Sequence, residues 1–296
     1  MSHPIADALG NAVGALRADK DMKAVLDQLG QLTDKHIEDL DPAAARLQPT
    51  PADAVKALLA SQGRDSDPLA LVPGVTTRDI SIPGPGGALS ARVFTPAGYR
   101  RSPEAKFPAA WDDALASYTW VSEHAQELNG NAARIALAGE SAGGNLALAT
   151  AIAARDRGLA RQPCHVLAVY PVTQTSLDTE SYLENAVAKP LNRAMVKWFV
   201  DKLINSKDDL KDKRLQLIDA DLSGLPGITI ISADIDPLRS DGAQMEDALR
   251  KARVPVERRN FDGVTHEFFG MSAVVEKARE AQAWAGDRLF EAFASA

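Results

Sequence analysis

Several features that mark special classes of protein are absent or rare in this sequence. There is one cysteine, Cys164, so no disulfide can form within the chain, and this suits a reducing compartment such as the cytoplasm. No apolar run approaches the roughly 18 residues that a membrane-spanning helix needs. The N-terminus lacks a basic stretch followed by an apolar one, which argues against a signal peptide. We therefore expect a cytoplasmic protein without a membrane span, in which Cys164 is a buried thiol on a strand.

The sequence also lacks an excess of positive charge. Its 33 Lys and Arg residues against 40 Asp and Glu residues give a net charge of −7, with no basic stripe to bind nucleic acid or an anionic membrane. Apolar residues make up 45% and charged residues 25% of the chain, which is ordinary for a globular protein and excludes a disordered one. A chain of 296 residues can bury a large core without metals or crosslinks.

The first quarter of the chain has helical periodicity. Three amphipathic stretches are visible, at Ile5–Leu16, Met22–Leu40 and Pro51–Gln62. The third has Thr50 as a predicted N-cap and proline at its first helical position. The pattern changes after residue 77, where apolar and polar residues alternate on both sides of a Pro/Gly turn at 83–87. This alternation predicts a two-stranded antiparallel hairpin over Arg78–Ala97.

From Pro108 onward, predicted helices and strands alternate. A polar helical insertion interrupts the alternation at 175–215. The predicted helices are 108–128, 143–156, 241–252 and 272–293, and the predicted strands are 134–138, 164–170, 227–233 and 256–260. Strands that alternate with helices predict an α/β fold, in which helices cover both faces of a parallel sheet.

The residues Gly139-Glu140-Ser141-Ala142-Gly143 fit the pattern G-x-S-x-G, with an apolar strand before it and a helix rich in alanine and leucine after it. This context predicts a nucleophile elbow, in which a strained backbone lifts the Ser141 hydroxyl above the sheet. We expect side chains at positions 139 and 143 to collide with neighbouring backbone. The N–H of Ala142, at the helix N-terminus, would contribute to an oxyanion hole. The alternative is a glycine-rich turn without catalytic function.

A nucleophilic serine needs a base, and the base needs an orienting acid. In α/β-hydrolases they follow in the order serine, acid, histidine. His266 follows the last predicted strand, whereas the other histidines lie outside the region where the base is expected: His3, His36, His124 and His165. Asp236 follows the strand 227–233 and is the predicted acid. Asp234 is the alternative acid or a support for it, and Asp241 is predicted to begin a helix.

Further short motifs accompany Gly-Glu-Ser-Ala-Gly-Gly-Asn at 139–145. They are Tyr99-Arg100, Pro103-Glu104, Phe107-Pro108-Ala109-Ala110, Tyr182–Phe199, the run 222–226, Asp236-Pro237-Leu238-Arg239 and His266 with Phe268. In kind and order these motifs resemble the bacterial hormone-sensitive-lipase-like esterases, over nearly the whole chain. The position of Arg239 beside the acid implies a structural role.

This resemblance implies an α/β-hydrolase fold, with a mostly parallel central sheet flanked by helices. A helical cap would consist of residues 1–75 and 175–215, and the catalytic domain of residues 76–174 and 216–296. The implied partner is a small-molecule ester, hydrolysed without a metal or cofactor. The family often pairs through its last strand and helix, which suggests a homodimer.

The sequence departs from the family in one respect, since it has no His-Gly-Gly-Gly motif for the oxyanion hole. Residues 94–98 lead directly into Tyr99-Arg100, so a strand, a helix and a second strand are missing between Gly98 and Tyr99, roughly 35–50 residues. These would be the central strands 3 and 4. The segment could be absent only from the stated sequence, or deleted from the gene, or its donors could be replaced, with Gly84, Gly86 and Gly87 as candidates. A Cα separation between Gly98 and Tyr99 well above about 3.8 Å would indicate the first case.

We therefore expect a serine carboxylesterase that hydrolyses esters of short-to-medium acyl chains through Ser141, Asp236 and His266. The alternative is an impaired or non-catalytic hydrolase-like protein that binds small molecules, since the oxyanion motif is absent. An amidase or deacetylase with the same three residues also stays open.

Overall fold

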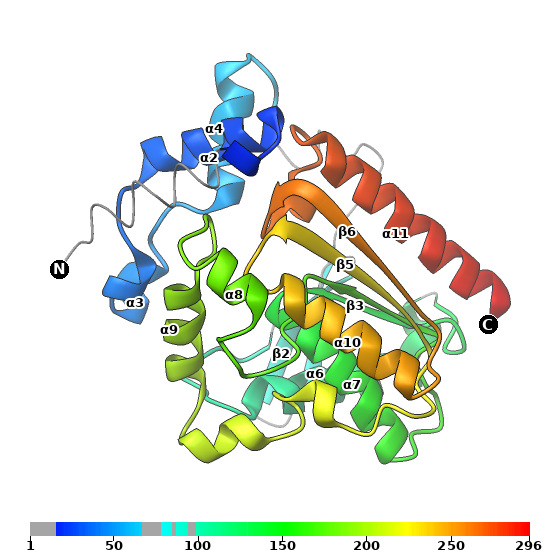
Figure 1. Ribbon diagram of the computed structural model, residues 1–296. Helices are drawn as coiled ribbons and strands as arrows, with labels where there is room; N and C mark the ends of the chain where they lie inside the picture. The colour runs from blue at the N-terminus through cyan, green and yellow to red at the C-terminus, as the bar shows by residue number, and fades with distance from the viewer. Residues whose placement is uncertain (1–15, 67–77, 85–86, 94–98, 129) are drawn as a thin grey trace.

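The computed structural model describes residues 16–66, 78–84, 87–93, 99–128 and 130–296. Its main sheet has four strands in the order β3-β4-β5-β6, all parallel (Figure 1). The strands are β3 (Ala136–Glu140), β4 (His165–Val169), β5 (Gly227–Ile235) and β6 (Val256–Thr265). The parallel sheet of an α/β fold is therefore confirmed.

Strand β4 shows why both faces of the sheet are covered. All of its residues are buried, as expected for a strand in a parallel sheet between two helix layers. Val166 and Ala168 pack in one apolar cluster with residues of α7 (Ala142–Asp156), β5 and α10 (Arg239–Lys251). Leu167 and Val169 pack in a second cluster, with residues of β6 and α11 (Glu276–Ser295). Successive side chains of a strand point to opposite faces, so this short apolar run holds the two layers together.

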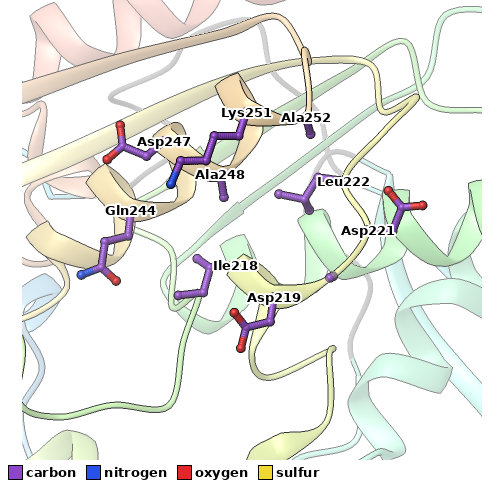
Figure 2. Close-up of a pocket in the computed structure, with 10 residues that line it drawn as sticks. Ile218, Asp219, Asp221, Leu222, Gln244, Asp247, Ala248, Lys251 and Ala252 are labelled. Carbon is purple, nitrogen blue, oxygen red and sulfur yellow. The ribbon is translucent and has the colours of Figure 1, made fainter.

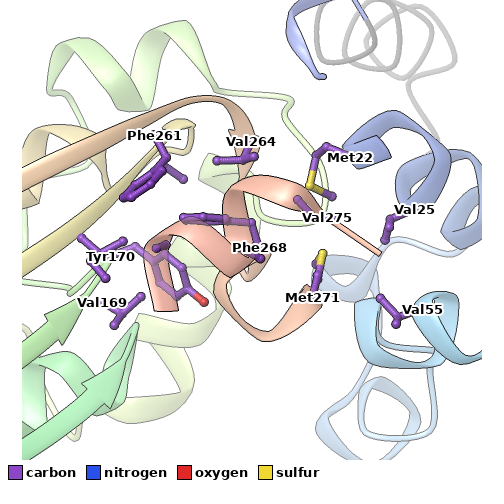
Figure 3. Close-up of a cluster of buried hydrophobic side chains, with 14 of the residues drawn as sticks. Met22, Val25, Val55, Val169, Tyr170, Phe261, Val264, Phe268, Met271 and Val275 are labelled. Carbon is purple, nitrogen blue, oxygen red and sulfur yellow. The ribbon is translucent and has the colours of Figure 1, made fainter. Parts of the chain in front are cut away.

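Two N-terminal helices, α2 (Lys20–Leu32) and α4 (Pro51–Ser61), pack against the second cluster. The short helix α3 (Pro42–Ala45) lies between them in the sequence. Figure 3 shows Met22, Val25 and Val55 of these helices facing Met271 and Val275, which precede α11. The predicted Thr50 cap is confirmed and forms a capping box with Asp53.

The helix predicted over Met22–Leu40 is shorter than expected. It ends at Leu32 because Thr33 is extended, and a 3-10 turn, η1 (Ile37–Asp39), follows. The stretch predicted at Ile5–Leu16 lies almost entirely outside the described residues.

The insertion is helical, as predicted. It contains α8 (Glu180–Glu184), α9 (Arg193–Leu203) and the 3-10 turn η3 (Lys207–Lys211). In Figure 1, α8 and α9 lie with α2–α4 near the end of the sheet to which the arrowheads of β5 and β6 point. Two hydrogen bonds join α9 to the N-terminal segment: Trp198 Nε1 donates to Leu40 O at 3.2 Å, and Asn192 Nδ2 donates to Glu38 Oε1 at 3.2 Å.

The predicted hairpin is also confirmed. Strands β1 (Arg78–Gly84) and β2 (Gly87–Val93) pair antiparallel and form a sheet of their own within the described residues. Among the described residues, the elbow strand β3 is the end strand of the main sheet, and in contrast to β4 its residues Ala138 and Glu140 are exposed. Gly98 lies outside the described residues, so the loss of a segment at the 98–99 junction stays a prediction.

Several other boundaries, and the burial of one residue, differ from the expectations. Strand β6 continues to Thr265 instead of ending at Asn260. The last helix begins at Glu276, because the 3-10 turn η5 (Phe268–Met271) precedes it. Helix α6 (Ala109–His124) passes into a 3-10 turn, η2 (Ala125–Leu128). Cys164 is half-buried and precedes β4 by one residue, so the prediction of a buried strand thiol was wrong. No helix in the described ranges is long and apolar enough to cross a bilayer.

Candidate active site

Ser141 lies at the turn between β3 and α7, in a rare backbone conformation. Its φ is 56° and its ψ −118°, which costs a non-glycine residue on the order of 1–3 kcal/mol and persists only where neighbours impose it. One such constraint is its N–H, which donates to Val169 O at 2.8 Å. The strand–turn–helix context expected from the sequence is therefore present.

The glycines of this turn have different steric roles. A Cβ at position 139 would lie 2.2 Å from Gly143 O, so only glycine fits there, as predicted. A Cβ at position 143 would have no atom within 4 Å, and the predicted collision at Gly143 was wrong. The second crowded position is Gly144, where a Cβ would lie 2.9 Å from Pro171 Cβ. The reason is tertiary, because the start of α7 crosses the segment that follows β4.

The structure brings together Ser141, Asp236 and His266. Asp236 follows β5 and His266 follows β6, and the exposed fractions of these two residues are 0% and 4%. His266 Nδ1 lies 2.7 Å from Asp236 Oδ2, and Nε2 lies 3.0 Å from Ser141 Oγ. Because a carboxylate only accepts hydrogen bonds, Nδ1 carries the proton and Nε2 is free to accept the serine hydroxyl proton. The Oδ1 atom of Asp236 accepts from the N–H of Leu238 at 2.9 Å.

The two other aspartates near β5 have different partners. Asp234 Oδ1 lies 3.1 Å from Arg17 and 3.0 Å from Arg239, which assigns Arg239 the structural role implied above. Asp241 lies in the first turn of α10, close to the predicted helix start. It is buried, and its carboxylate accepts from the N–H of Thr173 at 3.0 Å. Burial raises the pKa of Asp241 to about 8.

Opposing effects act on the imidazole of His266. Burial lowers its pKa, but the negative charges of Asp236, Glu267 and Glu140, together with the hydrogen bond to Asp236, raise it above its ordinary value. Tyr170 also contacts the ring, at a centroid distance of 4.6 Å. The sequence reasoning missed Tyr170, although its position after β4, next to the strand of the elbow, was an available signal.

Ala142 is the first residue of α7 and is exposed. The N–H of a first helical residue has no partner within its helix, and the helix dipole favours negative charge there. This suits the predicted oxyanion donor. Among the other donors considered, Gly86 lies outside the described residues. Within the described ranges, no group of three His, Cys, Asp or Glu residues could hold a metal ion.

A groove lies elsewhere on the surface, between α10 and the 3-10 turn η4 (Leu217–Asp219). Figure 2 shows Gln244, Asp247 and Lys251 on one side and Asp219 and Asp221 on the other. Its lining does not include Ser141, Asp236 or His266. The groove is therefore separate from the candidate active site.

Comparisons with known proteins agree with this architecture. A family model described as alpha/beta hydrolase fold matches residues 88–270. Carboxylesterase NlhH of Mycobacterium tuberculosis is 41% identical over 187 residues, covering 62% of this chain and 58% of NlhH. Esterase LipI of the same organism is 36% identical over 189 residues, with the same two coverages of 62% and 58%. The chain thus spans 58% of the length of these curated relatives.

Among solved structures, a hyperthermophilic esterase from the archaeon Pyrobaculum calidifontis aligns with a TM-score of 0.78 at 27% identity, covering 92% of this chain and 98% of that one. The family match extends over more than half of the sequence, from β2 into η5. On this ground, and on the parallel sheet with its serine elbow, the chain belongs to the alpha/beta hydrolase fold family.

Proposed function

We propose that this protein is a serine carboxylesterase. The observation that carries the proposal is the position of the His266 ring, which lies within hydrogen-bond distance of Ser141 at one nitrogen and of Asp236 at the other. Relatives named as a carboxylesterase and an esterase support the same reaction class. The resemblance implies no cofactor or metal for this chemistry.

The geometry supports a two-step reaction. Ser141 Oγ attacks the ester carbonyl while Nε2 of His266 takes the hydroxyl proton, and Asp236 stabilises the imidazolium that forms. The N–H of Ala142 donates to the oxyanion as the carbonyl oxygen becomes negative. His266 then gives the proton to the leaving alcohol. In the second step His266 removes a proton from water, which attacks the acyl-enzyme. The bond to Ser141 Oγ breaks, Oγ takes the proton back from His266, and the acid leaves.

We propose that the substrates are small esters with short-to-medium acyl chains, bound beneath a cap formed by residues 1–75 and 175–215. Contacts between the two segments support a common cap. Arg17 donates to Asn185 Oδ1 at 3.1 Å, and Asn185 in turn donates to Asp236 O at 3.2 Å. The cap segments therefore adjoin the loop that carries the acid. Rates on p-nitrophenyl esters from acetate to palmitate test the chain-length preference, which should decline beyond medium chains.

The decisive experiment compares the wild type with Ser141→Ala on p-nitrophenyl acetate and butyrate. Ser122→Ala is a matched control, because that hydroxyl on α6 only donates to Thr119 O within its own helix. Loss of hydrolysis in Ser141→Ala, with the control unchanged, supports the proposal. Equal rates in all three proteins would refute it.

A second candidate function is binding of a small molecule without catalysis. The missing His-Gly-Gly-Gly motif favours it, since removing one oxyanion donor from a protease costs about 10²–10³ in turnover. A fluorophosphonate probe separates the two candidates, because it labels an activated Ser141 and leaves a binding protein unlabelled. Hydrolysis of p-nitroanilides, rather than esters, would indicate the amidase alternative.

We also propose a homodimer and a cytoplasmic location. Both rest on the sequence-based reasoning given above. Light scattering during size-exclusion chromatography tests the first proposal, since a monomer mass would contradict it. Fractionation of the source cells tests the second, since recovery outside the cytoplasmic fraction would contradict it.

A further inference from the structure

Tyr170 occupies an unusual position directly after β4. Its φ is 35°, a value that L-residues with large side chains rarely adopt. Its backbone N–H donates to Ile231 O at 2.6 Å, and the residue is 1% exposed. A large side chain is therefore held in a strained conformation beside the candidate active site.

The two ends of the Tyr170 side chain contact different parts of the site. The ring lies against the imidazole of His266, with centroids 4.6 Å apart and planes inclined by 50°. The hydroxyl donates to Glu140 Oε2 at 2.6 Å. Figure 3 shows Tyr170 beside Phe268, whose ring centroid is 6.0 Å away, so the aromatic ring is also packed from a second side.

Strand pairing connects these contacts to the nucleophile. Glu140, the last residue of β3, is opposite Val169 in the β3–β4 register. The residue after it, Ser141, donates its backbone N–H to Val169 O, and this bond holds the serine backbone. Glu140 itself accepts the hydrogen bond from Tyr170, the residue after Val169, and this bond holds the tyrosine ring.

A histidine base needs a neighbour that fixes the orientation of its ring, because its two nitrogens must meet two partners at once. Rotation of the imidazole about its Cβ–Cγ bond would break both the 2.7 Å and the 3.0 Å contacts. The tyrosine ring, whose centroid lies 4.6 Å from that of the imidazole, opposes this rotation.

We propose that Tyr170 and Glu140 are positioning residues: the Glu140–Tyr170 hydrogen bond holds the tyrosine ring against His266 and so keeps the imidazole aligned between Ser141 and Asp236. This inference rests on the proposed function of the same site. Glu140 has a second, electrostatic effect through its charge. Burial and the neighbouring Glu140 also raise the pKa of Tyr170 well above its ordinary value, so the hydroxyl stays protonated and remains a donor.

The charged groups that face His266 are Asp236 after β5, Glu140 at the end of β3 and Glu267, its neighbour in sequence; each of the three raises the pKa of the imidazole. Glu140→Gln removes one of these charges but keeps an amide oxygen that can accept the Tyr170 hydrogen bond. Tyr170→Phe keeps the ring and the charge but removes the hydrogen bond. The two variants therefore separate the electrostatic effect from the positional one.

A purely structural role predicts a different outcome, and the structure provides a matched control for it. Tyr118 on α6 is also buried and donates one hydrogen bond, to Arg161 O at 3.0 Å. Tyr118→Phe and Tyr170→Phe each lose one partly buried hydrogen bond, so both should reduce the melting temperature, Tyr170→Phe by more because its acceptor is a carboxylate. Only Tyr170→Phe should disturb the alignment of His266 and so lower kcat.

The experiment measures the pH profile of kcat, the separate kcat and KM values for p-nitrophenyl butyrate, and the titration of His266 by NMR. We expect Tyr170→Phe to lower kcat about 10-fold with little change in KM, because misalignment of a reacting group by a fraction of an ångström is costly. We expect Glu140→Gln to lower the pKa of His266 by several tenths of a pH unit. Tyr118→Phe should change neither.

The positioning proposal is overturned if Tyr170→Phe matches Tyr118→Phe in kcat, and the electrostatic effect of Glu140 is refuted if Glu140→Gln leaves the His266 titration unchanged. The NMR titration needs no turnover, so it tests the inference independently of the esterase proposal. If the wild type hydrolyses no ester but the His266 titration still shifts in Glu140→Gln, the proposed function is refuted. The electrostatic effect of Glu140 on His266 is then still supported.

Discussion

The hydroxyl of Ser141 lies 3.0 Å from Nε2 of His266, although 125 positions separate the two residues in the sequence. They meet because β3 and β6 run parallel in one sheet, so the carboxyl ends of both strands lie at the same end of the sheet. Asp236 reaches the same edge from β5, which lies beside β6. Side chains that follow the strands of an open parallel sheet thus converge at one end, where ligands bind in such folds.

The first prediction concerns the acid. Replacement of Asp236 by asparagine should reduce kcat about 10⁴-fold, as in proteases where an amide in this position favours the wrong tautomer of the histidine. Asp234→Asn is the matched control, since Asp234 binds Arg17 and Arg239. Hydrolysis of p-nitrophenyl butyrate measures both variants. An equal loss in the two variants would contradict the assignment of Asp236.

The second prediction uses the difference between two glycines of the elbow. Gly139→Ala places a Cβ 2.2 Å from Gly143 O, and because both atoms belong to the turn we expect a loss of at least 1–3 kcal/mol of stability, roughly the cost of overpacking. A Cβ at Gly143→Ala meets no atom within 4 Å, so this change should leave the free energy of unfolding unchanged or raise it by less than about 1 kcal/mol. Thermal unfolding of both variants tests this, and equal destabilisation would refute the steric argument.

The third prediction is the pH dependence of activity. The raised pKa of His266 means that the imidazole stays protonated to a higher pH than a free imidazole, and the protonated form cannot accept the serine proton. The acid limb of kcat/KM should therefore lie above the ordinary imidazole pKa. The same shift stabilises the folded state at low pH, and this contribution is lost as the pH rises through the folded-state pKa. An acid limb at or below the ordinary value would contradict the assignment.

The fourth prediction concerns Asp241, whose pKa burial raises from 3.8 to about 8. Because the folded-state pKa lies above the unfolded one, the stabilising contribution of the neutral acid is complete below the unfolded pKa and is lost as the pH rises toward 8. Asp241→Asn should therefore remove part of the fall in melting temperature between acid and mildly alkaline pH. Asp208→Asn, at an exposed site, is the control. Parallel profiles for the wild type and Asp241→Asn would contradict the shift.

Much of this arrangement could be predicted from local patterns. The run 166–169 is apolar throughout, and a strand between two helix layers follows from that alone. The G-x-S-x-G motif pointed to Ser141, and the order of the predicted strands pointed to His266, but the choice between Asp236 and Asp234 stayed open until the structure placed Asp236 beside His266. The same local reasoning was wrong for Gly143, because contacts with Gly143 O and Pro171 decide which glycine is required. It also missed Tyr170, whose role depends on pairing between β3 and β4.

The last prediction concerns the end strand β3 and the segment predicted to be lost at the 98–99 junction. If the loss is real, the side of β3 that faces away from β4 has backbone groups without strand partners. Amide hydrogens of residues 136–140 should then exchange with solvent faster than those of residues 165–169, which lie between two strands. Hydrogen–deuterium exchange with peptide mass spectrometry measures this, and an intact mass of 31.6 kDa verifies the chain length in the same sample. Equally slow exchange in both strands would show that the free side of β3 is covered. A larger mass would show that the segment is present and that its loss is not a property of the protein.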